Sequence, residues 1–178
     1  MPPPDNSPRP NWLRVAVIGR DPKVTLIRAA ILAVVCVIVF KFVFLPVRVR
    51  GLSMDPTYKS GSVNFINRLS YIRHEPGRGD VVGLRLGRRS SSSAPSIMYL
   101  KRIVGLPGET VAFANGKLLI NGTILDEPYV KNPCDWNSEP VTVGDGQYYV
   151  VGDNRSMPQE DHEHGQAQRG QIVGKVLF

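Results

Sequence analysis

The feature that most constrains this chain is a long apolar stretch near its N-terminus. Residues 29–40 are all apolar, and the apolar character extends over residues 24–45, where Arg28 and Lys41 are the charged residues. A helix over residues 24–45 is about 33 Å long at about 1.5 Å per residue, which matches the hydrocarbon core of a bilayer at about 30 Å. Arg28 and Lys41 lie near its ends, where long side chains can reach the interface.

Two other interpretations of this stretch are weaker. A cleavable signal peptide should be followed by a small-residue cleavage site, but Pro46, Arg48 and Arg50 follow here. A core helix of a soluble protein should have one polar face, and this stretch is apolar all round. We therefore predict a single transmembrane anchor over residues 24–45.

The distribution of charge argues against nucleic acid as a partner. The chain has a net charge of +7, yet residues 51–178 contain 14 Lys and Arg against 13 Asp and Glu, so the excess lies in the first 50 residues. A nucleic-acid-binding domain should carry its own basic patch. The basic residues instead flank the anchor, where they can contact anionic lipid. On the N-terminal side they are Arg9, Arg14, Arg20, Lys23 and Arg28.

The same charges predict the topology and the domain organisation. Under the positive-inside rule the basic N-terminal flank is cytoplasmic. Residues 1–23 would then form a cytoplasmic, Pro-rich basic tail, and residues 46–178 a domain on the outer face of the membrane.

The outer domain is predicted to be mainly β, with no long amphipathic helix after residue 50. Two Asn-Gly pairs, at Asn115 and Asn121, predict type I′ turns and a three-stranded meander. A Ser-rich loop is expected at residues 87–95. The predicted strands are residues 81–86, 97–104, 111–114, 117–120, 123–125, 147–151 and 172–178.

Three segments of this domain carry residues that can do chemistry. Ser53 lies between a Gly and a Pro that can expose it on a bent backbone. Lys101 lies inside an apolar strand, and residues 152–156 form a polar turn after another strand. Taken alone, each has a simpler interpretation: a turn serine, a solvated strand lysine and an ordinary loop.

Taken together and in this order, the segments resemble the conserved boxes of type I signal peptidases, the membrane-bound serine proteases of the S26 family. The resemblance covers roughly residues 25–178. It rests on Gly51-Leu52-Ser53-Met54-Asp55-Pro56-Thr57, on Asp80 in Arg78-Gly79-Asp80-Val81-Val82, on residues 101–109, on residues 121–129 ending Glu127-Pro128-Tyr129, and on Gly152-Asp153-Asn154-Arg155.

The resemblance implies a Ser/Lys catalytic dyad. Ser53 would be the nucleophile and Lys101 the general base, with the oxyanion held by the Ser53 amide. At the reference pKa of about 10.4, under about 0.1% of a lysine is neutral at pH 7, so Lys101 should be buried. Met54 would lie near the substrate and Pro56 would shape the turn. Structural support of the site would come from Gly51, Asp80, Gly152, Asp153, Asn154 and Arg155.

The function implied is removal of N-terminal signal peptides from secreted preproteins with small residues at positions −1 and −3. Such a peptide can bind as an added strand. No metal or cofactor is expected. The enzyme would be a single-pass protein of the plasma membrane, and the absence of a transit-peptide pattern favours a bacterial membrane over an organellar one. The alternatives are a catalytically silent peptide-binding domain and a Ser/Lys peptidase specialised for one client.

One loop departs from the family pattern. Pro158 aligns where the family has a Ser that hydrogen-bonds the lysine, and Ser156 is a candidate replacement only if the loop is rearranged. An ion pair between Glu160 and His162 would replace an Asp/Arg pair of the family and would be pH-sensitive. Residues 160–164 also suggest a metal site, but no third ligand has suitable spacing.

Overall fold

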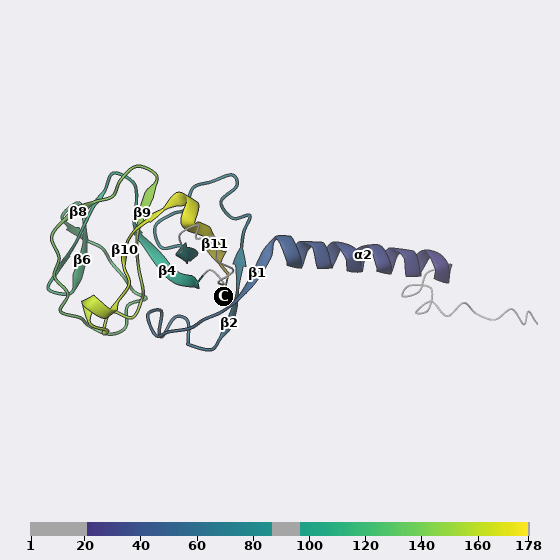
Figure 1. Cartoon of the computed structure of the whole chain (residues 1–178), viewed down its shortest axis with the longest axis horizontal. Helices are drawn as coiled ribbons and strands as arrows, with labels where there is room; N and C mark the ends of the chain where they lie inside the picture. Colours follow the sequence, from purple (N-terminus) through teal and green to yellow (C-terminus); the bar gives the residue numbers. More distant parts are fainter. Residues whose placement is uncertain (1–20, 87–96, 178) are drawn as a thin grey trace, which may run out of the picture. The chain divides into compact units, whose positions relative to one another are not determined.

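The computed structural model describes residues 21–86 and 97–177. The chain divides into two compact units, residues 1–42 and residues 43–178. Figure 1 shows the helix of the first unit and the strands of the second. The predicted tail lies almost entirely outside the described residues, and so does the loop predicted at residues 87–95.

The first unit contains one long helix, α2 (Pro22–Phe42). Pro22 occupies its first position, where the missing N–H costs nothing, and the Asp21 side chain accepts a hydrogen bond from the Lys23 amide at 2.9 Å. None of its residues is buried, and it is long and apolar enough to cross a membrane.

The helix ends before the predicted anchor does. Residues 43–45 are not helical, because Phe44 begins the strand β1 (Phe44–Arg48), which pairs with β2. Pro46 within β1 explains the change, since a proline disfavours helical backbone in the residue before it and cannot continue a helix.

The second unit is mainly β, as predicted. Its larger sheet is antiparallel throughout, with the order β1-β2-β11-β3-β4-β9-β10. Its remaining strands are β2 (Val63–Asn67), β3 (Val81–Leu86), β4 (Ile97–Gly105), β9 (Gln147–Val151), β10 (Gly165–Gln168) and β11 (Ile172–Val176).

The smaller sheet has the order β7-β6-β5-β8 and contains the predicted meander. Its strands are β5 (Thr110–Ala114), β6 (Lys117–Ile120), β7 (Thr123–Ile124) and β8 (Val141–Thr142). Asn115 and Asn121 both have positive φ, at 48° and 51°, and so do the glycines after them, as type I′ turns require. All seven predicted strands are present; β1, β2, β8 and β10 were not predicted.

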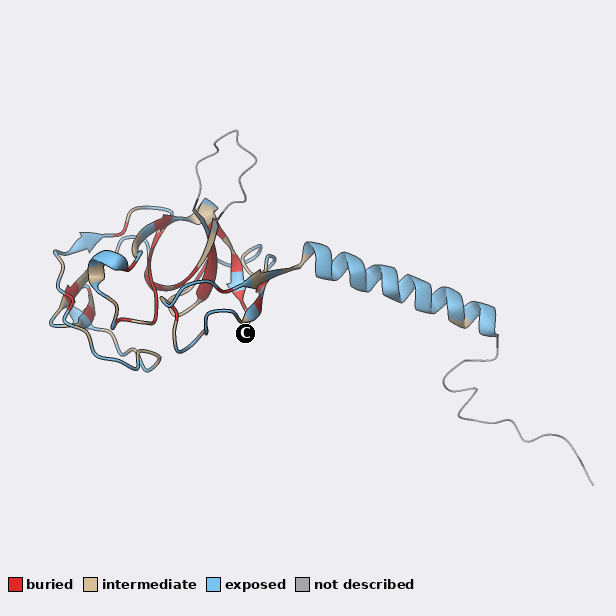
Figure 2. Cartoon of the chain, turned by 60° about the horizontal axis from the view of Figure 1, so that its bottom comes forward, coloured by how far each residue is buried: buried red, intermediate tan, exposed pale blue. Residues whose placement is uncertain are grey.

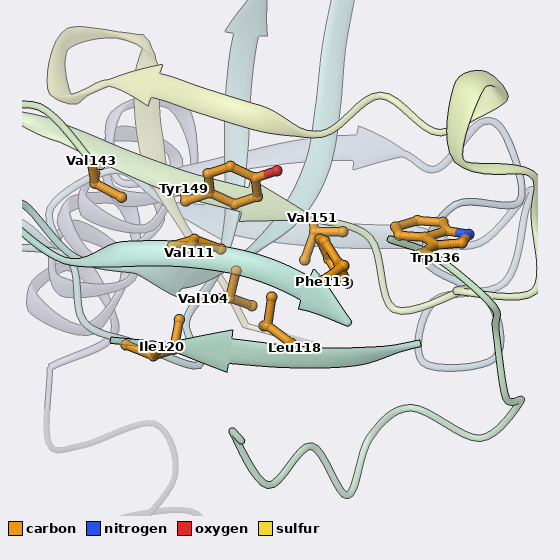
Figure 3. Close-up of a cluster of buried hydrophobic side chains, with 9 residues drawn as sticks. All are labelled: Val104, Val111, Phe113, Leu118, Ile120, Trp136, Val143, Tyr149 and Val151. Atoms are coloured by element: carbon orange, nitrogen blue, oxygen red, sulfur yellow. The ribbon is translucent and has the colours of Figure 1, made fainter. Parts of the chain in front are cut away.

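Three clusters of buried side chains hold these sheets together. In Figure 2 the buried residues are concentrated in the strands of the second unit, whereas α2 is exposed. The cluster drawn in Figure 3 packs the smaller sheet against β4 and β9, with Phe113 and Trp136 in edge-to-face contact at 5.2 Å. The members of that cluster are Val104, Val111, Phe113, Leu118, Ile120, Trp136, Val143, Tyr149 and Val151.

The order of the larger sheet determines where the candidate residues lie. Ser53 is in the loop between β1 and β2, and Lys101 is in β4. The strand β11 lies between β2 and β3, so the last strand of the chain joins the strand pair that carries Ser53 to the pair that carries Lys101.

Candidate active site

The loop that carries Ser53 is fixed by turns and by one buried neighbour. The Asp55 amide donates to the Leu52 carbonyl at 3.0 Å, and the Tyr58 amide donates to the Met54 carbonyl at 2.9 Å. Met54 is 2% exposed and belongs to a buried cluster with Leu100 of β4. The residue after Ser53 therefore ties the loop to the core.

Gly51 and Pro56 bracket this loop as the sequence indicated. Gly51 has φ of 96°, a left-handed conformation that favours glycine, and a Cβ there would meet no other atom within 4 Å. Gly51 is thus required for its backbone conformation rather than for space. Pro56 is exposed in the turn that follows Ser53.

Asn154 clamps the loop from the other side. Its amide donates to the Ser53 carbonyl at 3.0 Å, and its side-chain Nδ2 donates to the Leu52 carbonyl at 3.0 Å. Gly152 permits this approach, because a Cβ at that position would lie 2.1 Å from the Ser53 carbonyl oxygen. The predicted supporting role of these two residues thus corresponds to direct contact with the Ser53 backbone.

Ser53 lines a small groove of about 20 Å³. The groove is also lined by Met54, by residues 47–51 and by residues 98–100 of β4. Within the part of the chain that the structure describes, the Ser53 amide donates no hydrogen bond. That N–H is available to an oxygen atom bound in the groove.

Lys101 is buried, which decides between the two interpretations of the sequence. It is 3% exposed and pairs with Val82 across β3 and β4. Burial lowers its pKa to about 8, although the charge of Glu163 acts in the opposite direction. With that pKa about one Lys101 in ten is neutral at pH 7, and the neutral amine can accept a proton.

Asp153 ties β4 to the clamp that holds Ser53. Its carboxylate, 1% exposed, accepts two hydrogen bonds from the Arg102 guanidinium, at 2.8 Å from Nε and 2.6 Å from Nη2. Arg102 also stacks on Tyr129 at 3.9 Å from the ring centroid. Because Arg102 follows Lys101 directly, this bidentate pair fixes the strand at the lysine.

Arg155 fixes the other end of the same loop. Its side chain is 1% exposed and donates to the two Glu127 oxygens, at 3.0 and 2.5 Å, and to the Gly152 carbonyl at 2.9 Å. The Tyr129 hydroxyl donates to Glu127 at 2.7 Å. Residues 152–155 are therefore held between the Ser53 loop and the segment around Glu127.

Asp80 supports β3 and β4 rather than the reacting groups. Its carboxylate accepts hydrogen bonds from Tyr71 at 2.9 Å and Gly77 at 3.0 Å, and pairs with Lys175 of β11 at 2.6 Å. Burial alone would raise the pKa of Asp80, but these partners together lower it. Its backbone carbonyl also accepts from the Ile103 amide.

The loop after Arg155 differs from the expectation. Glu160 is exposed, whereas His162 is 3% exposed, and neither His162 ring nitrogen has a hydrogen-bond partner among the described residues. The predicted Glu160–His162 ion pair is therefore wrong, because the ring turns into the core while the carboxylate stays in solvent. The Ser156 hydroxyl is also engaged elsewhere, since it donates to Asn154 Oδ1 at 2.7 Å.

Residues 160–164 do not assemble a metal site. Among the described residues no group of three His, Cys, Asp or Glu side chains is placed to hold an ion. His164 instead contacts the Tyr149 hydroxyl at 2.8 Å and stacks on Trp136 at 5.5 Å. Aromatic packing is the observed role of that residue.

Two cavities that are larger than the groove at Ser53 lie in other parts of the domain. They measure about 730 and 490 Å³; the first is lined by residues such as Trp136, Arg155 and Met157, and the second by residues such as Leu125 and Glu127. Neither includes Ser53 or Lys101. Volume alone therefore does not identify the reactive part of this domain.

Sequence reasoning gave no role to three residues that the structure places around the site, Arg102, Glu127 and Tyr129. It gave His162 an ion pair that the structure does not contain. A buried arginine needs a carboxylate as its partner, so the sequence could have suggested that Arg155 pairs with an Asp or Glu. Nothing in the sequence indicates which acid it is, or that His162 is buried.

Comparison with known proteins places this chain in a family. The family model described as "Signal peptidase, peptidase S26" matches residues 23–178. Signal peptidase IB of Staphylococcus aureus is 32% identical over 171 residues, covering 86% of each chain. Signal peptidase I of Leptolyngbya laminosa is 34% identical over 127 residues, covering 70% of this chain and 63% of the relative. The crystal structure of a signal peptidase I from Enterococcus faecalis V583 matches with a TM-score of 0.43 and 28% identity, covering 58% of this chain and 97% of that one.

A serine held at a groove and a buried lysine of lowered pKa are the features of a hydrolase of the serine endopeptidase class. Within that class, this chain belongs to the signal peptidase family, peptidase S26.

Proposed function

We propose that this chain removes N-terminal signal peptides from preproteins, with Ser53 as nucleophile and Lys101 as general base. Membership of the signal peptidase family supports the reaction. The observation that carries the assignment of residues is the burial of Lys101, because burial lowers its pKa to about 8 and makes the neutral amine accessible at physiological pH.

The reaction proceeds in two halves. The Ser53 oxygen attacks the scissile carbonyl carbon and its proton passes to the Lys101 amine. The C–N bond then breaks, the leaving amine takes the proton from Lys101, and the acyl group remains on Ser53. Water next attacks the ester while Lys101 accepts its proton, which releases the signal peptide and restores the serine.

The Ser53 amide is the proposed oxyanion donor. This N–H makes no hydrogen bond among the described residues, and the Asn154 contacts to the Leu52 and Ser53 carbonyls fix the peptide plane that carries it. Gly51 offers no side-chain hydroxyl, so the donor is a backbone group.

The groove beside Ser53 suits an extended peptide. Residues 47–51 and 98–100 present two backbone segments that can hydrogen-bond an added strand. Alternate side chains of such a strand point to the same side, and the groove is small, at about 20 Å³, which favours small residues at −1 and −3. Replacing Ala by Leu at −1 or −3 of a model preprotein should abolish cleavage; equal rates would refute this selectivity.

Ser53→Ala and Lys101→Ala test the dyad directly. Each variant should bind a model preprotein and fail to cleave it, and Ser53→Ala should form no acyl-enzyme with a slowly hydrolysed ester. Full activity of either variant would refute the dyad. A wild-type protein that binds preproteins without cleaving them would favour the silent binding domain instead.

The membrane topology is part of the proposal. The helix α2 would cross a bacterial plasma membrane once, with the N-terminus cytoplasmic and residues 43–178 outside; the basic residues before it and the bacterial source of the named relatives support this. In sealed right-side-out vesicles, added protease should degrade residues 43–178 and spare the N-terminus. The reverse pattern would refute the orientation.

A further inference from the structure

His162 is a buried polar group that the proposed reaction does not use. It is 3% exposed and both its ring nitrogens are without a hydrogen-bond partner among the described residues. Buried polar groups in folded proteins nearly always have partners, and leaving one unpaired is costly. His162 therefore needs an explanation.

The His162 ring lies beside the nucleophile loop. Its Cε1 and Nε2 are each 2.7 Å from the point that a Cβ on Gly152 would occupy, and the same point is 2.1 Å from the Ser53 carbonyl oxygen. Trp136 packs edge-to-face against the ring at 4.9 Å between centroids. The ring is thus fixed between Trp136 and Gly152, with Nε2 on the side of Ser53.

The charged groups around the ring keep it neutral. Burial, followed by the charges of Lys101 of β4, His164 and Arg155, lowers the pKa of His162 to about 4; only the Glu163 backbone acts in the opposite direction. At neutral pH the ring therefore carries one nitrogen lone pair that can accept a hydrogen bond.

Near His162, the Lys101 amine also lacks a hydrogen-bond partner among the described residues, and it makes no ion pair with them. Lys101 lines a cavity of about 120 Å³ together with Glu163 and His164, the two residues that follow His162. Two other positions of the loop are excluded, since Pro158 has no donor or acceptor in its side chain and the Ser156 hydroxyl is bound to Asn154.

We propose that neutral His162 accepts a hydrogen bond from the Lys101 amine through Nε2 and so positions the base toward Ser53. This inference rests on the proposed Ser53–Lys101 dyad. His162 acts through Lys101 and is a positioning residue. It does not take the proton from Ser53, because a ring that stays neutral down to pH about 4 is too weak a base.

The test compares His162→Phe, His162→Gln and a control in the full-length protein in detergent micelles, with a model preprotein as substrate. His162→Phe keeps a ring against Trp136 and removes both nitrogens, and His162→Gln restores one amide oxygen as an acceptor near the position of Nε2. The control is His74→Phe, because His74 is exposed and does not line the cavity that contains Lys101.

His162→Phe should lower kcat roughly ten- to hundredfold at constant KM, because the base is no longer held in place. It should also move the midpoint of the pH profile down by about 0.5 to 1 pH unit, since a lost acceptor no longer stabilises the protonated amine. His162→Gln should recover most of the rate, and His74→Phe should keep the wild-type midpoint. A folded His162→Phe protein with wild-type kcat and pH midpoint would overturn the inference.

A second measurement does not depend on His162→Phe folding. Imidazole ¹⁵N spectra of the wild type and of Lys101→Met should differ at His162, because the variant removes the donor; identical His162 shifts would overturn the inference. The same variant separates the two proposals. Full activity of Lys101→Met refutes the dyad itself, whereas an inactive Lys101→Met beside a normal His162→Phe refutes the positioning role alone.

Discussion

At the scale of single residues, Lys101 shows how burial creates a base. A lysine in solvent is protonated at every physiological pH, and the fold changes this by surrounding the amine with apolar neighbours. The neighbouring Arg102 keeps its charge, because its guanidinium forms an ion pair with Asp153. Two adjacent cations thus have pKa values shifted in opposite directions, because Arg102 forms an ion pair with Asp153 whereas burial dominates at Lys101.

The pH dependence of cleavage follows from this difference. With the pKa of Lys101 at about 8, kcat/KM should rise about tenfold per pH unit below that value and level off above it. Initial rates on a model preprotein between pH 6 and 10 measure this profile. A rate that is flat from pH 6 to 8 would contradict a lysine base.

The buried pair of Arg155 and Glu127 predicts a large effect on stability. Glu127→Gln leaves the 1%-exposed Arg155 guanidinium without its counter-charge and should cost about 3 kcal/mol of unfolding free energy, measured by urea unfolding in detergent. Glu75→Gln is the matched control, because Glu75 pairs with Arg169 in solvent at 73% side-chain exposure and should change stability far less. Equal losses in the two variants would contradict this account.

The sequence predicted the candidate site residues but not their partners. Ser53, Lys101 and residues 152–155 were predicted from motifs, because each of them lies within a short contiguous stretch of characteristic residues. Glu127 and Tyr129 were assigned no role, and His162 was assigned a wrong ion pair, because their positions depend on how distant segments pack. The burial of His162 beside Gly152 is a property of the folded loop alone.

At the scale of secondary-structure elements, the predicted strands were those with clear alternation or turn signals. The missed strands lack both. β1 contains Pro46 and continues the apolar run of α2, so no boundary marks it. β2 buries Asn64 and exposes Val63 and Phe65, which reverses the usual pattern. The polar β10 has few strand-forming residues.

Gly152 tests how closely the loop of residues 152–155 and the loop that carries Ser53 must approach each other. In Gly152→Ala the added Cβ would meet the Ser53 carbonyl oxygen and the His162 ring, so the loops must separate. We expect kcat to fall about a hundredfold and stability to drop by about 1–3 kcal/mol.

Gly170→Ala is the matched control for this prediction. A Cβ on Gly170 meets nothing within 4 Å, and that glycine has no positive φ. Its activity and thermal unfolding midpoint should remain those of the wild type. Similar losses in both variants would show that the effect of Gly152→Ala is not due to contact with Ser53.

At the scale of the whole molecule, the two units should be separable. The three buried clusters contain no residue of α2, and none of the helix residues is buried. A chain that begins at Val43 should therefore keep its β circular dichroism and cleave a soluble model preprotein. It should no longer float with lipid vesicles, whereas the full chain should. Loss of the β spectrum would contradict this independence.

The place of β11 in the larger sheet also has a consequence for the biosynthesis of the protein. This strand is synthesised after the other ten described strands, yet it lies between β2 and β3 and pairs with both. Until the ribosome has released residues 172–176, the hairpin with the serine and the strand pair with the lysine have no sheet in common. We expect a nascent chain to be proteolytically silent until residues 172–176 have left the ribosome and paired with both strands.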